Sequence, residues 1–95
     1  MAVTKSYFHC RWIHDHPDEP VDLYSELDAD RYELRKVYVF KDGHGEAAGP
    51  GIEMGTTWLS PEPCPPLAEI AAQAGFEPRE ITREEFEAVW RKYAG

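Results

Sequence analysis

Four prolines stand within the seven residues 60–66 (Ser-Pro-Glu-Pro-Cys-Pro-Pro) and divide the chain into parts of different periodicity. Proline fixes its own backbone angle and has no amide hydrogen, so neither a helix interior nor a central strand can include this segment. We expect a semi-rigid, extended connector. Because 95 residues suffice for one small domain only, we interpret the connector as a hinge within a single domain, 1–95. It joins a sheet part (6–59) to a helical part (67–93).

Before the connector, apolar residues recur at every second position. The segments 7–14, 21–28 and 32–40 all show this alternation, which is typical of half-buried strands. Asp42-Gly43 predicts a hairpin turn, and residues 52–59 could supply a further strand after a glycine-interrupted stretch. The pattern therefore predicts an antiparallel sheet of about three to four strands within residues 5–59.

After the connector, the period changes to that of a helix. A first helix is expected over about 66–74, ending before Gly75. A second is expected over 83–93, because Thr82 and Glu85 have the spacing of a capping box. Its apolar stripe consists of Phe86, Val89, Trp90 and Tyr93. Strands followed by helices predict an α+β domain with both helices packed on one face of the sheet.

Acidic residues are concentrated in one segment. Residues 15–30 contain no Lys or Arg and carry −7 of the formal net charge of −8. The simplest interpretation is a solubilising surface. The functional interpretation is a landing site for a basic protein, and the same charge argues against nucleic acid as a partner. The acids are Asp15, Asp18, Glu19, Asp22, Glu26, Asp28 and Asp30.

A two-residue hairpin loop at Ala29-Asp30 would set the register of the next two strands. Glu26 would then lie opposite Glu33, and Tyr24 opposite Arg35. This register gathers Leu23, Leu27, Tyr32 and Leu34 on the core face. The other face would carry Tyr24, Glu26, Asp28, Arg31, Glu33 and Arg35. That face is either a solvated ladder of ion pairs or a recognition face on which Arg31 and Arg35 bind carboxylates.

Catalytic and metal signals are sparse. His14 and His16 are the only metal-ligand candidates, and without a zinc-binding framework we expect no metal and no cofactor. Cys10 and Cys64 are too far apart for a zinc motif and are expected to be reduced thiols. A Glu26–Glu33 pair could perform acid–base chemistry. Neither a nucleophile–base pair nor a phosphate loop is evident, which leaves the question of an enzyme open but disfavoured.

Several segments resemble a bacterial family known only as a domain of unknown function. They are Arg11-Trp-Ile-His-Asp, Leu23-Tyr-Ser-Glu-Leu-Asp, Glu33-x-Arg-Lys-Val37 and Ile81-Thr-Arg-Glu-Glu-Phe, and the resemblance spans about residues 8–90. It implies a small free-standing bacterial protein and transfers no activity to any residue. The size and acidity are similar to those of immunity proteins of bacterial toxin systems, an analogy of charge and fold class only.

Two functional hypotheses follow. In the first, the chain is a protein-interaction module whose acidic segment docks a basic partner, with Trp12, Tyr24 and Arg31 as anchors. In the second, it is a small enzyme or ligand-binding domain with His14, Glu26, Glu33 and Arg35 around a polar pocket. Interaction candidates are Trp12, Asp15, Asp18, Glu19, Asp22, Tyr24, Glu26, Asp28, Arg31, Glu33 and Arg35.

The expected location is the cytoplasm. No apolar run reaches the roughly 20 residues of a membrane span, and Met1–Lys5 lacks the apolar core of a signal peptide. The sequence leaves open whether a second copy of the chain covers the free face of the sheet in a homodimer.

Overall fold

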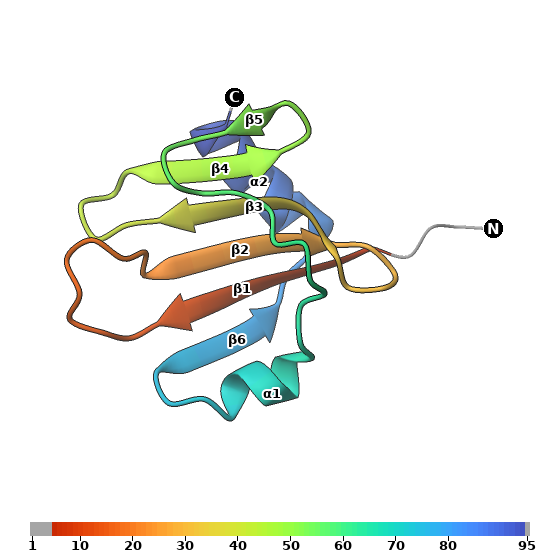
Figure 1. Cartoon of the computed structure of the whole chain (residues 1–95), viewed down its shortest axis with the longest axis horizontal. Helices are drawn as coiled ribbons and strands as arrows, with labels where there is room; N and C mark the ends of the chain where they lie inside the picture. The colour runs from red at the N-terminus through yellow and green to blue at the C-terminus, as the bar shows by residue number, and fades with distance from the viewer. Residues whose placement is uncertain (1–4, 95) are drawn as a thin grey trace.

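The computed structural model describes residues 5–94, which form a six-stranded antiparallel sheet and two helices (Figure 1). The strand order is β5-β4-β3-β2-β1-β6, so five strands form a meander and the sixth returns to pair with the first. Of the Met1–Lys5 stretch, only Lys5 lies within the described residues. The elements are β1 (Ser6–Trp12), β2 (Asp22–Leu27), β3 (Glu33–Val39), β4 (Gly45–Gly49), β5 (Ile52–Glu53), α1 (Leu67–Ala71), β6 (Phe76–Glu80) and α2 (Arg83–Tyr93).

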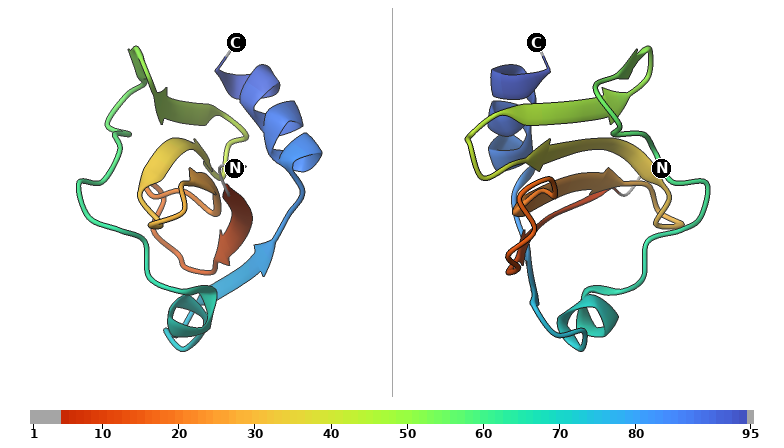
Figure 2. Two further views of the ribbon diagram at one scale, coloured as in Figure 1. Left: turned by 90° about the vertical axis from the view of Figure 1, so that its right-hand side faces the viewer. Right: turned by 60° about the vertical axis from the view of Figure 1, so that its left-hand side comes forward.

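Each face of the sheet is covered by a different part of the chain. We call the face that carries Phe8 and Cys10 the front face and the opposite one the back face. The strap, residues 56–66 between β5 and α1, crosses the front face, while α2 lies on the back face (Figures 1 and 2). On the front, Phe8, Cys10 and Leu27 form a buried cluster against which Leu67 and Ile70 of α1 pack. This cluster and the apolar side of α2 make up the two halves of the core.

The back face is shaped to accept aromatic side chains of α2. Phe86 is fully buried, and its ring lies 5.6 Å from the ring of Tyr7 on β1. A Cβ at Gly49 would approach the Trp90 ring to 2.9 Å, and one at Gly45 would collide with the Tyr93 ring. Glycine is therefore needed at positions 45 and 49 of β4, because a side chain at either position would push α2 away from the sheet.

The sheet is larger than the alternation of apolar residues predicts. The expected three to four strands are wrong, because Gly45–Gly49 and Phe76–Glu80 also pair into the sheet. Phe76–Glu80 was expected to lie in the helical part, but it pairs with β1 at the edge of the sheet. It lacks an apolar alternation and contains Pro78, which a sheet tolerates at its edge.

The helices also differ from the prediction. Their placement on one face is wrong, since α1 packs on the front cluster and α2 packs on the back. The first helix ends at Ala71 instead of 74, and Ala71 and Ala74 are exposed. The short helix α1 covers only the front cluster, and the side chains of Leu67 and Ile70 are sufficient to make that contact.

The register of the β2–β3 hairpin differs from the expected one. Its loop is longer than Ala29-Asp30, because Arg31 adopts a left-handed conformation with φ of 69° and extends the turn. The Asp28 carboxylate fixes this turn by accepting hydrogen bonds from the backbone N–H groups of Asp30 and Tyr32, both at 2.9 Å. Tyr32 is consequently 43% exposed at the loop instead of lying in the core.

A bulge then changes which residues are opposite one another. Leu27 pairs with Glu33 and Glu26 pairs with Arg35, so that Leu34 is the extra residue. Glu33 therefore lies on the front face, and the expected Glu26–Glu33 pair is not formed.

Other local predictions are confirmed. The Asp42-Gly43 turn closes a hairpin in which the Phe40 N–H donates to the His44 carbonyl at 2.9 Å. Helix α2 begins at the expected capping box, with Thr82 as its N-cap. Its stripe of Phe86, Val89, Trp90 and Tyr93 is buried or half-buried.

We expect Thr82→Ala to lower the free energy of unfolding by about 1 kcal/mol. The Thr82 hydroxyl accepts from the Glu85 N–H at 3.1 Å, and the Glu85 carboxylate accepts from the Thr82 N–H at 3.1 Å. Urea denaturation measures the change, with Thr56→Ala at an exposed strap position as the matched control. Equal loss in the two variants would contradict a stabilising role for the cap.

Candidate functional site

The loop between β1 and β2 presents three exposed carboxylates at one end of the sheet, those of Asp15, Asp18 and Glu19. Within residues 5–94, none of the three forms an ion pair. Their charges are therefore directed to solvent. We call residues 13–20 the acidic loop.

The His14 side chain links backbone groups of the acidic loop by hydrogen bonds. Its Nε2–H donates to the Pro20 carbonyl at 2.8 Å, and its Nδ1 accepts from the His16 N–H at 2.9 Å. Both ring nitrogens are thus used by the backbone of the loop. Over the described part of the chain, no group of three or more His, Cys, Asp or Glu side chains is arranged to hold a metal ion.

Apolar side chains lie next to these carboxylates. Trp12 stacks on Phe76 of β6 with ring centroids 5.4 Å apart and an interplanar angle of 11°. Ile13 is 58% exposed. A shallow hollow of about 370 Å³ is lined by Trp12, His16, Pro17, Asp18 and Glu19. The loop thus combines negative charge with an accessible apolar surface.

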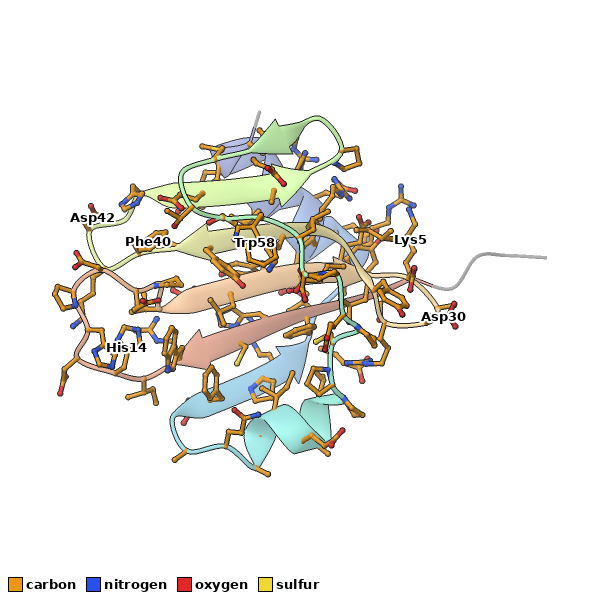
Figure 3. All side chains as sticks on the ribbon, viewed as in Figure 1. Lys5, His14, Asp30, Phe40, Asp42 and Trp58 are labelled. Atoms are coloured by element: carbon orange, nitrogen blue, oxygen red, sulfur yellow. The ribbon has the colours of Figure 1, made fainter. Side chains whose placement is uncertain are left out.

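The other acids of the segment 15–30 do not extend this surface. Asp22 lies on the back face, where it is 2.8 Å from His9 Nε2 and accepts from Arg11 at 3.2 Å. Glu26 is only 3% exposed, beneath α2. Asp30 lies at the end of the sheet opposite His14, as the labels of Figure 3 show, and Asp28 directly follows the end of β2 on that side. The acids therefore do not form one continuous patch.

The expected anchors are also separated. Tyr24 lies on the back face, where its ring packs against that of His9 at a tilt of 33°, with centroids 4.6 Å apart. Arg31 donates to the carbonyls of Cys64 and Pro65 at 2.9 and 2.8 Å, and thereby ties the strap to the hairpin. Of the three expected anchors, only Trp12 lies at the end of the sheet that carries the acidic loop. The Nε–H and Nη2–H groups of Arg31 already donate to the strap, so this pair of donors is not available to a partner's carboxylate.

Arg35 is the centre of an ion network between the sheet and α2. Its guanidinium donates to Glu26 at 2.7 and 2.9 Å and to Glu87 at 3.1 and 2.7 Å. It also lies 5.0 Å from the Phe86 ring centroid and 4.9 Å from that of Trp90. Arg35 does bind carboxylates, as a recognition face requires, but these carboxylates belong to its own chain.

This network fixes the ionisation of its members. Burial of Glu26 by itself favours the neutral acid and is the largest single effect. The hydrogen bonds from Arg35 and Tyr7, together with the charges of Arg35 and Lys5, outweigh burial and lower the pKa of Glu26. The bonds to Glu26 and Glu87 raise the pKa of Arg35. Glu26 therefore stays ionised and cannot act as a general acid near neutral pH.

The four residues of the expected polar pocket do not meet. Glu26 and Arg35 lie under α2 on the back face, Glu33 lies on the front face, and His14 is inside the acidic loop. A site built from these four side chains is therefore not formed.

The front face carries a polar cluster that our sequence analysis missed. Lys36 is 5% exposed, and its Nζ lies 2.9 Å from Glu33 Oε1 and 3.0 Å from the Tyr38 hydroxyl. The Ser60 N–H of the strap donates to the same Glu33 oxygen at 2.7 Å. One signal could have revealed it: Lys36 has the same parity as Tyr38 and Phe40 in an otherwise apolar stripe.

The cysteines lie beside this cluster. Cys10 belongs to the buried front core, and Cys64 of the strap packs against it. The structure has both as free thiols. Burial raises the pKa of each thiol, which keeps it protonated and poorly nucleophilic.

We expect Arg35→Met to lower the free energy of unfolding by about 3 kcal/mol at neutral pH, because it leaves the buried Glu26 carboxylate without its main partner. Arg83→Met is the matched control. Arg83 reaches Glu87 at 3.9 Å but is 71% exposed, so its loss should have little effect. Comparable losses in the two variants, measured by urea denaturation, would contradict the assigned role of Arg35.

The same pair predicts a dependence on pH. The folded-state pKa of Glu26 is lowered. The contribution of ionised Glu26 to the free energy of unfolding is therefore complete above its unfolded-state pKa of about 4.3, and it is lost as the pH falls through the folded-state pKa. In Arg35→Met, protonation instead relieves an unpaired buried charge. The stability difference between wild type and Arg35→Met should therefore narrow as the pH is lowered from neutral into this acidic range. A difference independent of pH would contradict this account.

Neither helix in the described part of the chain is long and apolar enough to cross a membrane.

Comparison with known proteins identifies a family but no activity. No curated protein and no solved structure matches the sequence. A family model described as "Domain of unknown function (DUF6881)" matches residues 6–95, which confirms the resemblance to a family of unknown function. Since the match covers almost the whole chain, the protein belongs to the family of the domain of unknown function DUF6881.

Proposed function

We propose that this protein is an interaction module that binds a basic protein partner through the acidic loop. The observation that carries the proposal is the set of three exposed carboxylates, Asp15, Asp18 and Glu19, none of which forms an ion pair within residues 5–94. Charges of one sign at one end of a protein raise the association rate with an oppositely charged surface. The site is therefore smaller than the whole segment 15–30, and it excludes Asp22 and Glu26.

Apolar side chains beside the acidic loop supply the buried contact that charged groups alone do not provide. Exposed ion pairs add little affinity, so a stable complex needs a buried contact in its centre. Ile13 is 58% exposed, and Trp12 lines the hollow beside Asp18 and Glu19. The bonds from His14 hold the loop in one conformation before binding, which reduces the entropy lost on association.

The partner we propose is a different protein and not a second copy of the chain. Two acidic loops facing each other would repel, which disfavours a homodimer through this end. A bacterial cytoplasmic role fits the free thiols of Cys10 and Cys64, since that compartment keeps thiols reduced. An immunity-like role, in which the loop blocks a basic toxin enzyme, is one form that this interaction could take.

Reversing the three charges tests the proposal. The variant Asp15→Lys, Asp18→Lys, Glu19→Lys should slow association with the partner by roughly tenfold or more at low salt and reduce the salt dependence of the rate. The partner is first captured from host lysate with wild-type protein and then purified. Rates are measured by surface plasmon resonance.

A second triple variant separates the loop from the overall charge. Glu53→Lys, Glu62→Lys, Glu69→Lys changes three exposed acids outside the loop and alters the net charge equally. It should retain most of the wild-type association rate. If both triple variants slow association to the same extent, the acidic loop is not the docking site.

A further inference from the structure

Lys36 occupies a position on the front face where an apolar residue would be expected. It lies in the middle of β3, is 5% exposed, and pairs across the sheet with Ser25 and Ala48, which are both buried. Ionised side chains are rarely buried so completely unless they are paired. Lys36 is paired with Glu33 and Tyr38, and its Nζ lies 4.8 Å from the centroid of the Tyr38 ring.

This lysine is a hydrogen-bond donor and not a nucleophile. Burial alone would lower the pKa of Lys36, but its interactions with Tyr38 and Glu33 outweigh burial and raise it. The ammonium group therefore keeps three hydrogens, of which Glu33 and Tyr38 use two. The third hydrogen and the hydroxyl hydrogen of Tyr38 are both left for another acceptor.

A hollow of about 220 Å³ opens beside Lys36, between β3 and the strap. Trp58 of the strap is 58% exposed, and Figure 3 shows it over β3 on the front face. Around it stand three hydroxyl-bearing side chains of the strap. The lining residues are Lys36, Tyr38, Thr56, Thr57, Trp58 and Ser60.

The charges around the hollow favour a neutral ligand. Glu33 already compensates Lys36, while Glu46 accepts a hydrogen bond from Thr57 at 2.9 Å and lies 3.6 Å from Nε2 of His44, its own basic neighbour. No net positive charge is therefore left to attract an anion. The Lys36 ammonium in turn repels a cation that would otherwise stack on Trp58.

We propose that the hollow between Lys36 and Trp58 binds a neutral polyhydroxylated ligand, a sugar ring. The apolar C–H face of the ring would lie on the indole of Trp58, because exposed aromatic surface gains most from such a contact. The ring hydroxyls would accept from Lys36 and Tyr38 and would pair with the hydroxyls of Thr56 and Ser60. A lining of hydroxyl groups around one aromatic side chain offers both donors and acceptors, as a polyol requires. This site is separate from the acidic loop, so each proposal can fail alone.

Nuclear magnetic resonance of nitrogen-labelled protein tests this site. Glucose, galactose and N-acetylglucosamine are titrated separately, each up to about 50 mM, because a single sugar in an open site is expected to bind with a dissociation constant on the order of millimolar. At least one sugar should shift the indole N–H signal of Trp58 and the backbone signals of Thr57 and Ser60. Adenine and acetate are titrated in parallel as an aromatic base and a small anion.

Variants show whether the shifts report this hollow. Trp58→Ala should weaken sugar binding by roughly tenfold or more, whereas Tyr32→Ala, which removes an aromatic ring that is 43% exposed at the hairpin loop, should leave it unchanged. Trp58 is largely exposed, so its replacement tests binding without removing a core residue. Lys36→Met, checked for folding by circular dichroism, should also weaken binding.

Three results would overturn the proposal. The first is that none of the three sugars shifts the Trp58 signal. The second is that adenine or acetate shifts it and the sugars do not, which would assign the hollow to an aromatic base or an anion. The third is that sugar-induced shifts persist unchanged in Trp58→Ala.

Discussion

The register of the β2–β3 hairpin decides which charged side chains meet on each face of the sheet. Arg31 adopts a left-handed conformation at the loop, and the bulge that follows moves the pairing by one residue. Glu26 consequently lies opposite Arg35 on the back face, while Glu33 reaches Lys36 on the front face. A simple two-residue loop would have placed the Glu26 and Glu33 carboxylates opposite each other and moved Glu33 away from the face that carries Lys36. The ion network under α2 and the polar cluster under the strap both depend on this one turn.

Arg31 also links the hairpin to the strap. Its guanidinium donates to the carbonyls of Cys64 and Pro65, and its own carbonyl accepts from the Cys64 N–H at 2.8 Å. The prolines stiffen the strap, and these bonds hold its end against the sheet. β3 supplies one wall of the front-face hollow. The strap, which follows β3 later in the sequence, supplies the other wall.

Internal pairing of the basic residues explains where negative charge remains accessible. Arg11, Arg35 and Lys36 each bind an acid of the same sheet, so these acids present little free charge to solvent. The acidic loop lies beyond the ends of β1 and β2, where no basic side chain forms an ion pair with it within residues 5–94. Net charge is a property of composition, whereas the position of the unpaired charge depends on which strands lie side by side.

Elements whose signals are local could be predicted from the order of the amino acids. The capping box at Thr82 and Glu85, the turn at Asp42-Gly43 and the presence of strands β1 to β3 all depend on residues a few positions apart, and they formed as expected. The parity of Lys36 within an apolar stripe was also readable, although its partners were not. The pairing of β6, the separation of the two helices, the hairpin register and the dispersal of the acidic segment became visible only in the folded chain. These features depend on contacts between distant segments, such as the Trp90 ring against Gly49, whose free energies a local pattern does not contain.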